Sequence, residues 1–268
     1  MKVKSRSEHL IARDYVAQLA ARGRYGFSSS EARSALNVSA NAANKALKRL
    51  KDQGILASPE REFYVIVPPE YRALGCLPAE QFVPALMEQK QLPYYAGLLS
   101  AAQYYGAAHQ RPQQFQVVLA RNRRPIECGK VRVSFIARKR IDDVPIKEFN
   151  TARGTIRVST PEATAIDLAG YPSHAGGLSH VATVLDELAE AISPGLLPMA
   201  ADTAPIPWAQ RLGYLLELVD ANEAASVLED YISAKAREYT LLAPGHASAG
   251  ERSARWKIIT NASVEPDL

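Results

Sequence analysis

One short stretch of the sequence, residues 39–51, is dense in side chains that form hydrogen bonds with nucleic acids. The side chains concerned are Ser39, Asn41, Asn44, Lys45, Lys48 and Arg49. The two amides can each form a pair of hydrogen bonds with adenine, and the cations can bond guanine or phosphate, with the last two favouring phosphate. The serine hydroxyl can donate to a phosphate at the start of a helix. We interpret this stretch as a helix that reads DNA.

The residues around this stretch predict how it is held. Ser28 and Glu31 have the spacing of a capping box, which starts a helix, and Asn37 suits the end of that helix. Ser39 can cap a second helix, which Gly54 ends. Apolar residues recur at helical spacing along one side of this second helix, so its polar side faces outward. The pattern predicts two helices joined by a tight turn.

The flanking segments complete a recognisable order of elements. Residues 9–22 predict an earlier helix, and residues 55–57 and 63–67 predict two strands joined by a turn at residues 58–62. Three helices followed by a hairpin are typical of a winged helix-turn-helix. Arg61, at the hairpin tip, can reach a phosphate and joins the predicted DNA-binding set, which also includes Ser28.

Charge along the chain agrees with a nucleic-acid partner at the N-terminal end. Residues 1–67 contain 12 Lys/Arg against 6 Asp/Glu, whereas residues 151–268 contain 8 against 15, within a net charge of +4. Such asymmetry points to an anionic partner for the basic end, and double-stranded DNA is our prediction. The alternative is a solvated basic face on a module that binds protein.

A second basic set follows in the middle of the chain. It consists of Arg121, Arg123, Arg124, Lys130, Arg132, Arg138, Lys139 and Arg140. This set could extend a DNA footprint or contact a protein that handles nucleotides, and the alternative is that strand ends and turns carry exposed cations for solubility.

Other chemistry finds little support in the sequence. No Gly-rich loop follows a strand at phosphate-binding spacing, no Ser-His-Asp arrangement stands out, and the two cysteines, Cys76 and Cys128, lack the spacing of a zinc site. We therefore expect no enzyme activity, no metal and no cofactor, and we interpret the cysteines as buried thiols. No apolar run is long enough to span a bilayer, so we expect a cytoplasmic protein without a membrane partner.

The predicted fold class is α+β, with two domains. Residues 1–80 form the winged helix-turn-helix and residues 81–268 form a C-terminal α+β domain with a small sheet of about four strands and a helical C-terminal part. Within the second domain, residues 93–106 predict a helix, and Thr160 caps another that starts at Pro161. Asp167, on that later helix, is expected to accept a hydrogen bond from an arginine or a backbone amide in the core.

Four features in this order resemble the AbiEi antitoxins of bacterial abortive-infection (type IV) toxin–antitoxin systems. They are the N-terminal winged helix, residues 95–106 (YAGLLSAAQYYG), residues 154–168 (GTIRVSTPEATAIDL) and residues 255–261 (RWKIITN). No single one is diagnostic, and their order and spacing carry the resemblance over nearly the whole chain.

The resemblance implies an antitoxin that takes part in phage defence. It implies that the N-terminal domain represses the protein's own promoter and that the C-terminal domain counteracts a cognate nucleotidyltransferase toxin, by direct or indirect means. Two other classes stay open from the residues alone. One is a winged-helix transcription factor whose C-terminal domain senses a small ligand, and the other is a nuclease guided by the winged helix.

Overall fold

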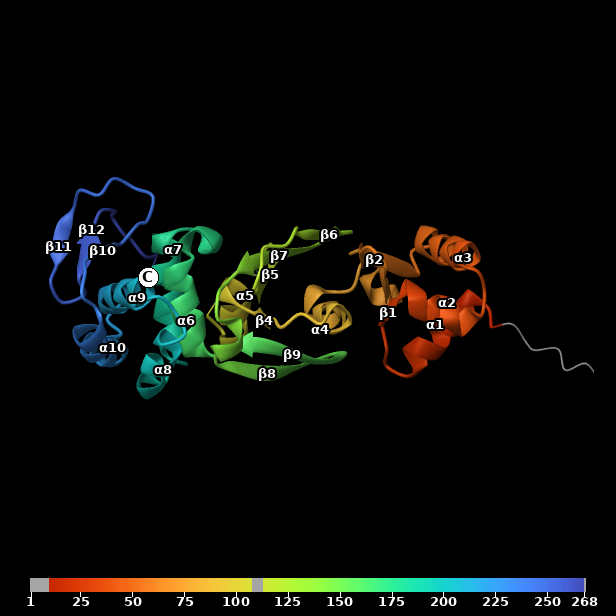
Figure 1. The fold of residues 1–268 in the computed structure, drawn as a ribbon, viewed down its shortest axis with the longest axis horizontal. Helices are drawn as coiled ribbons and strands as arrows, with labels where there is room; N and C mark the ends of the chain where they lie inside the picture. The colour runs from red at the N-terminus through yellow and green to blue at the C-terminus, as the bar shows by residue number, and fades with distance from the viewer. Residues whose placement is uncertain (1–9, 108–112, 268) are drawn as a thin grey trace, which may run out of the picture. The chain divides into compact units, whose positions relative to one another are not determined.

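The computed structural model describes residues 10–107 and 113–267 (Figure 1). It contains helices and small sheets, and the predicted α+β class is confirmed. The chain divides into two compact units. The first contains the chain up to Leu92 with Arg124–Ser134 and Phe149–Ile156, and the second contains Pro93–Arg123, Phe135–Glu148 and the chain from Arg157. Whether residues 1–80 and 81–268 are independent domains stays a prediction.

Six short elements open the first unit. They are α1 (Ala12–Ala21), β1 (Gly26–Ser28), α2 (Ser29–Leu36), α3 (Ala40–Asp52), β2 (Leu56–Glu60) and β3 (Phe63–Ile66). The strands form an antiparallel sheet in the order β1-β3-β2. The predicted helices and hairpin are present, and β1 is an additional strand. The first helix was expected to begin at His9, which lies outside the described residues.

Local capping explains where α2 and α3 begin and end. The Ser28 hydroxyl accepts a hydrogen bond from the amide of Glu31 at 3.0 Å, and the Ser39 hydroxyl accepts one from the amide of Ala42 at 3.3 Å. Asn37 ends α2 in the left-handed conformation, with φ of 51°. The carboxylate of Glu31 forms an ion pair with Arg24 at 2.7 Å, so its role is different from the reciprocal capping bond that the sequence suggests.

The β2–β3 hairpin is tighter than expected. The sequence predicts a turn over residues 58–62, whereas β2 continues to Glu60 and the turn is Arg61 with Glu62. A bulge between Ala57 and Glu60 accommodates the extra residues, and the Ser58 hydroxyl donates to the carbonyl oxygens of Glu60 and Phe63. Arg61 therefore lies at the tip of the hairpin, exposed to solvent.

An apolar cluster holds these elements together. Its buried members are Tyr15, Val16, Leu19, Phe27, Ala32, Leu36, Leu47, Leu50, Leu56 and Ile66. Phe27 lies between two rings, edge-on to Tyr15 at 5.5 Å and stacked on Tyr64 at 5.8 Å. The cluster draws on α1, α2, α3 and the sheet, so burial of apolar surface fixes α3 against the rest of the module.

The remaining elements of the first unit follow the hairpin. They are the 3₁₀ turn η1 (Pro69–Tyr71), α4 (Ala79–Lys90) and β6 (Ile126–Cys128). Arg153 is held within this unit, because its guanidinium lies 3.6 Å from the centre of the Tyr25 ring and its Nε donates to Gln81 at 2.9 Å. This contact ties a segment distant in sequence to the residues just before β1.

The larger sheet has six strands in the order β6-β7-β5-β4-β9-β8. The strands other than β6 are β4 (Tyr95–Ala96), β5 (Phe115–Leu119), β7 (Val131–Ala137), β8 (Ile146–Thr151) and β9 (Gly154–Ser159). β4 pairs antiparallel with β5 and parallel with β9. The sequence predicts four of the six, and it misses β4 and β6 because strands of two and three residues are too short to show a period.

The helix predicted over residues 93–106 is wrong in its first part. Tyr95–Ala96 is the strand β4, and only Leu98–Ala102 is helical (α5), followed by the 3₁₀ turn η2 (Gln103–Tyr105). Gly97 has an extended backbone and passes so close to β5 that an added Cβ would lie 2.7 Å from Val118 Cγ2. This close approach explains the glycine and the change from strand to helix.

The second unit is mainly helical after β9. Its helices are α6 (Pro161–Gly170), α7 (Leu178–Ala189), α8 (Leu197–Ala201), α9 (Ile206–Leu218) and α10 (Asn222–Lys235), with 3₁₀ turns η4 (Pro172–Ala175) and η5 (Pro194–Leu196). A small sheet in the order β10-β12-β11 follows, built from Thr240–Leu241, Ile258–Thr260 and Glu251–Ser253. Residues 193–207, which are rich in proline and glycine, contain the short helix α8.

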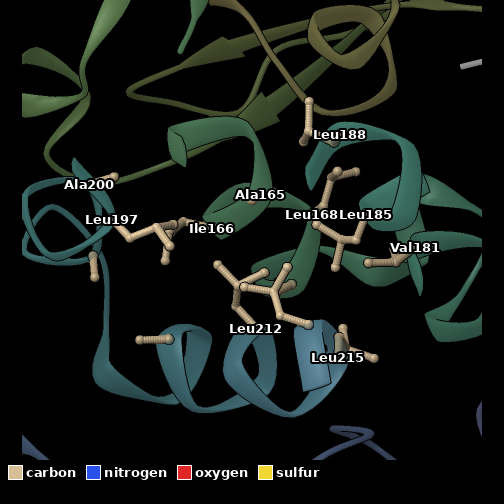
Figure 2. Close-up of a cluster of buried hydrophobic side chains, with 14 of the residues drawn as sticks. Ala165, Ile166, Leu168, Val181, Leu185, Leu188, Leu197, Ala200, Leu212 and Leu215 are labelled. Carbon is tan, nitrogen blue, oxygen red and sulfur yellow. The ribbon is translucent and has the colours of Figure 1, made fainter. Parts of the chain in front are cut away.

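Helix α6 is the centre of this unit's core. The Thr160 hydroxyl accepts from the amide of Ala163 at 3.4 Å, as predicted, and every residue from Glu162 to Ala169 is buried. Figure 2 shows Ile166 and Leu168 of α6 among apolar side chains of the helices α7, α8 and α9. A helix that is buried all round needs partners on every side, and these helices provide them.

Two glycines allow tryptophans to pack directly on helix backbones. An added Cβ would lie 2.3 Å from the ring of Trp208 at Gly170 and 2.3 Å from the ring of Trp256 at Gly213. Trp256 is completely buried, and its Nε1 donates to Glu217 at 2.5 Å. The Trp256 ring therefore packs the C-terminal segment against α9, and it can do so because residue 213 is a glycine without a side chain.

We predict that Gly213→Ala destabilises the protein by about 1–3 kcal/mol, because the new methyl group must displace the Trp256 ring. Urea unfolding followed by tryptophan fluorescence measures the change. Gly195→Ala is the matched control, because an added Cβ there meets nothing within 4 Å. Equal stability of the Gly213 variant and the wild type would contradict this account of the packing.

Candidate nucleic-acid interface

Helix α3 has one buried and one exposed face. Ala43, Leu47 and Leu50 are buried against the rest of the module. The predicted DNA-binding residues of this helix lie on the other face and are all exposed: Asn41, Asn44, Lys45, Lys48 and Arg49. The helix can therefore offer a continuous row of donors without disturbing its core.

The other predicted DNA-binding residues differ in their availability. Ser39 is exposed at the start of α3, and Arg61 is exposed at the hairpin tip. Ser28 is half-buried, caps α2, and lies within hydrogen-bonding distance of the Ser30 hydroxyl at 2.9 Å. Its role in the structure is thus to hold α2, and its hydroxyl is already engaged.

The second basic set does not form one cluster within one unit. Arg124, Lys130 and Arg132 belong to the first unit, and the others belong to the second. In the second unit Arg121 and Lys139 are exposed, and Arg123 lies over the ring of Phe135 at 5.3 Å. The set is therefore divided between the two units and is described unit by unit.

Two members of this set are occupied by protein partners. Arg140 forms an ion pair with Asp143 at 2.9 Å and donates to the carbonyl oxygen of Asp202. Arg138 is only 2% exposed and forms an ion pair with Asp167 at 2.9 Å. The prediction of an exposed Arg138 therefore needs correction, because its charge is buried in the core.

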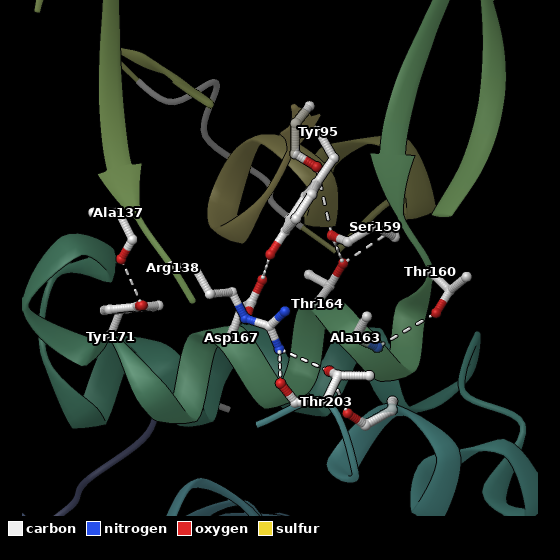
Figure 3. A network of polar contacts seen from close by, with 12 residues as sticks. Tyr95, Ala137, Arg138, Ser159, Thr160, Ala163, Thr164, Asp167, Tyr171 and Thr203 are labelled. Atoms are coloured by element: carbon white, nitrogen blue, oxygen red, sulfur yellow. Dashed lines mark hydrogen bonds and ion pairs between the residues drawn. The ribbon is translucent and has the colours of Figure 1, made fainter. Parts of the chain in front are cut away.

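Arg138 is part of a buried polar network (Figure 3). Its Nη2 donates to the Thr203 hydroxyl at 2.8 Å, and the Tyr95 hydroxyl donates to the Asp167 carboxylate at 2.7 Å. The guanidinium also lies 5.6 Å from the centre of the Trp208 ring. The expectation that Asp167 accepts from an arginine in the core agrees with this arrangement.

Competing effects act on the Asp167 carboxyl. Burial raises its pKa, whereas the charge of Arg138 and the hydrogen bond from Tyr95 lower it. The resulting pKa is about 6. The group is therefore mainly ionised at neutral pH and balances the arginine charge. Because both charges are removed from water, each depends on the other for compensation.

A polar cleft of about 510 Å³ lies in the first unit, beside α2 and α4. Arg24, Tyr25, Glu31, Gln81 and Arg153 are among the residues that line it. The sequence offers no signal for this cleft, because Arg153 lines it from the turn between β8 and β9, far along the chain from Tyr25. The sequence-based alternative expects an apolar ligand pocket in the C-terminal domain, and this cleft differs in both place and polarity.

The part of the chain that the structure describes contains no group of three or more His, Cys, Asp or Glu side chains able to hold a metal ion. Within residues 10–107 and 113–267, each helix is too short or too polar to cross a membrane.

We predict that Asp167→Asn lowers the free energy of unfolding by about 3–5 kcal/mol, because it leaves the charge of Arg138 buried without a counter-charge. Chemical denaturation at pH 7 measures the loss. Asp143→Asn is the control, since it breaks an exposed arginine pair and should cost less than about 1 kcal/mol. A loss below 1 kcal/mol at Asp167 would show that the buried pair is dispensable.

Comparison with known proteins agrees with this architecture. No curated protein matches the sequence. The crystal structure of the Rv2827c protein from Mycobacterium tuberculosis superimposes with a TM-score of 0.64, at 16% identity, over 94% of this chain and 93% of that one. At this identity the likeness concerns the fold alone.

A family match is more specific. Residues 95–218 match the AbiEi antitoxin C-terminal domain, and they include β4, the network around Asp167 and the helices α6 to α9. The resemblance inferred from residue patterns is confirmed by this match. Residues 95–218 therefore form a domain that matches the AbiEi antitoxin C-terminal domain, which supports an AbiEi-type antitoxin.

Proposed function

We propose that this protein is an antitoxin that binds its own promoter DNA through α3 and counteracts a cognate nucleotidyltransferase toxin through its C-terminal domain. The AbiEi domain at residues 95–218 supports the antitoxin role in a toxin–antitoxin system. The exposed face of α3 is the observation on which the DNA-binding part rests.

The dimensions and chemistry of α3 suit the major groove. It spans Ala40–Asp52, its exposed face carries two amides and several cations, and its first amides are available where Ser39 caps it. A helix entering the groove by its N-terminal part would place Asn41 and Asn44 near base edges, and Lys48 and Arg49 near the backbone. We infer that base recognition comes from the first turns of α3.

The hairpin supplies a second contact of a different kind. Arg61 lies in a two-residue turn that is braced by the hydrogen bonds of Ser58. A cation at such a tip can bond a phosphate without reading sequence. Repression then follows from occupancy of the promoter, with α3 choosing the site and Arg61 adding affinity.

We propose that the toxin-neutralising surface lies in the second unit, which contains most of the AbiEi domain. Arg121 and Lys139 are its exposed members of the central basic set and are available to an anionic surface or to a nucleotide-bearing partner. We place this contact apart from α3, so that DNA binding and neutralisation are separable by mutation.

For DNA, we predict that Asn44→Ala combined with Lys45→Ala removes the preference for the promoter over unrelated DNA, because base contacts carry specificity. Arg61→Ala should instead weaken binding to both and lower the slope of log K against log salt by about 1. A mobility-shift series at several salt concentrations measures both effects. Arg237→Ala, exposed in the C-terminal part, is the control. Promoter preference that survives the double substitution excludes α3 as the reading element.

For neutralisation, we predict that Arg121→Glu with Lys139→Glu abolishes rescue of growth when the protein is co-expressed with its cognate toxin, while promoter binding changes less than about twofold. These two positions are chosen because Arg138 and Arg140 have protein partners whose loss would destabilise the fold. Arg237→Glu with Arg252→Glu serves as a control with the same change in charge, at exposed positions outside the basic set. Full rescue by the double variant means that these cations are not part of the neutralising surface.

A ligand-responsive transcription factor is the second candidate, and the polar cleft beside α2 is the observation that favours it. The neighbouring gene distinguishes the two. A nucleotidyltransferase gene next to this one agrees with the antitoxin, whereas a metabolic operon agrees with a ligand-responsive regulator.

A further inference from the structure

The two cysteines of the sequence, 52 positions apart, meet in the first unit. Cys76 is completely buried and Cys128 is 9% exposed, and both are free thiols. Their side chains are hydrogen-bonded to each other. The sequence alone suggests two unrelated buried thiols, so this contact is a property of the fold.

The backbone on both sides of the pair is in close contact. The amide of Lys130 donates to the carbonyl oxygen of Leu74 at 2.7 Å. An added Cβ on Gly129 would lie 2.9 Å from the Cα of Gly75, so these two glycines face each other directly. The turn that contains Leu74 and Gly75 is therefore in direct contact with the turn that contains Gly129 and Lys130, and Cys76 and Cys128 adjoin these two turns.

This approach leaves no room for side chains at the central pair. Gly75 and Gly129 have φ of 70° and 60°, and an added Cβ on Gly129 would lie 2.1 Å from the Leu74 oxygen. Two glycines therefore let these two turns come into close contact beside the two cysteines. A disulfide requires such proximity, because its Cβ atoms must lie about 3.5–4.5 Å apart.

The two thiols differ in pKa and in exposure. An attacking thiol needs the lower pKa and the better access to solvent, and a resolving thiol needs neither. The hydrogen bond from the Cys76 thiol lowers the pKa of Cys128, and the charge of Lys51 and the amide of Ser58 act in the same direction. Burial and its role as donor raise the pKa of Cys76. Cys128 is thus the thiol that ionises first, and it is also the more exposed of the two.

We propose that Cys76 and Cys128 form an intramolecular disulfide when the protein meets a peroxide. Cys128 is the attacking thiol and Cys76 the resolving one. No catalytic or DNA-contacting role elsewhere in the molecule uses either side chain.

The reaction balances with hydrogen peroxide as the oxidant. The Cys128 thiolate attacks one peroxide oxygen, the O–O bond breaks, and the hydroxide that leaves takes up a proton to give water. Cys76 then attacks the sulfur of the resulting sulfenic acid, forms the S–S bond and releases a second water. The two thiols lose two electrons in all, and the peroxide gains them.

The position of Cys128 connects this chemistry to α3 and the hairpin. Lys51 belongs to α3 and Ser58 to β2, and both act on the Cys128 sulfur. Formation of the disulfide prevents the Cys128 sulfur from taking on a negative charge beside these two groups. We therefore expect oxidation to change the affinity for promoter DNA. This expectation rests on the proposed DNA-binding function, whereas formation of the disulfide does not.

The test uses the reduced full-length protein and one equivalent of hydrogen peroxide. We expect the intact mass to fall by two hydrogens, a digest without reductant to contain Cys76 and Cys128 in one cross-linked species, and dithiothreitol to reverse both. Cys76→Ser should stop at a sulfenic acid on Cys128 that dimedone traps. Cys128→Ser should consume peroxide at least about tenfold more slowly, and Cys76→Ser with Cys128→Ser is the blank for methionine oxidation.

The intact mass and the digest of the wild-type protein test the disulfide even if a variant fails to fold. An unchanged mass, added oxygen without a cross-link, a disulfide between molecules, or a bond that forms only after unfolding in urea would each overturn the proposal. A mobility shift with reduced and oxidised protein is recorded separately. Absence of DNA binding in both states argues against the proposed function, and it leaves the mass result to decide the disulfide.

Discussion

The second unit depends on a charge pair that has been removed from water. Arg138 follows β7, Asp167 lies in the middle of α6, and the two are further bonded by Thr203 after α8 and Tyr95 in β4. Four segments from distant parts of the chain thus meet at one guanidinium and one carboxylate. Because an uncompensated charge in the core is costly, only the arrangement that brings all four together is stable. The pair therefore selects the packing of sheet strands against helices.

This constraint explains why α6 can be buried on every side. Its apolar residues meet α7, α8 and α9, and its one central acid is matched by the arginine. At its C-terminal end Gly170 admits the Trp208 ring, which also lies near the Arg138 guanidinium. Aromatic packing and charge compensation therefore use the same side chains. A change at one of them is expected to disturb the others, since their energies are coupled.

The parts of this fold that local chemistry determines were predictable. The starts of α2, α3 and α6 follow from Ser28, Ser39 and Thr160, whose hydroxyl groups bond amides three residues ahead. Strands of two or three residues, such as β4 and β6, depend on partners far along the chain and leave no local pattern. The short helix α8 is stabilised by burial of Leu197 and Ala200, which its surrounding prolines do not reveal.

The candidate sites show the same division. The exposed face of α3 follows from helical period, so its residues lie where the sequence places them. The contact of Cys76 with Cys128 has no sequence signal, because the spacing of a pair says nothing about a chain that turns back on itself. The polar cleft also depends on the turn between β8 and β9, which brings Arg153 to Tyr25. Contacts between residues far apart in the chain could therefore not be predicted from the sequence.

The central basic residues show why charge density in a sequence is a poor guide to charge on a surface. Arg138, Lys139 and Arg140 are consecutive, yet one is buried against a carboxylate, one is exposed, and one is bound to an aspartate and a carbonyl oxygen. Exposed charges act together only within about 8–10 Å in physiological salt. Cations divided between two units cannot be added into one patch from their sequence positions. A partner surface has to be sought unit by unit among exposed cations. In this run Lys139 and Arg140 are both exposed, but Arg140 is engaged by Asp143 and by the carbonyl oxygen of Asp202.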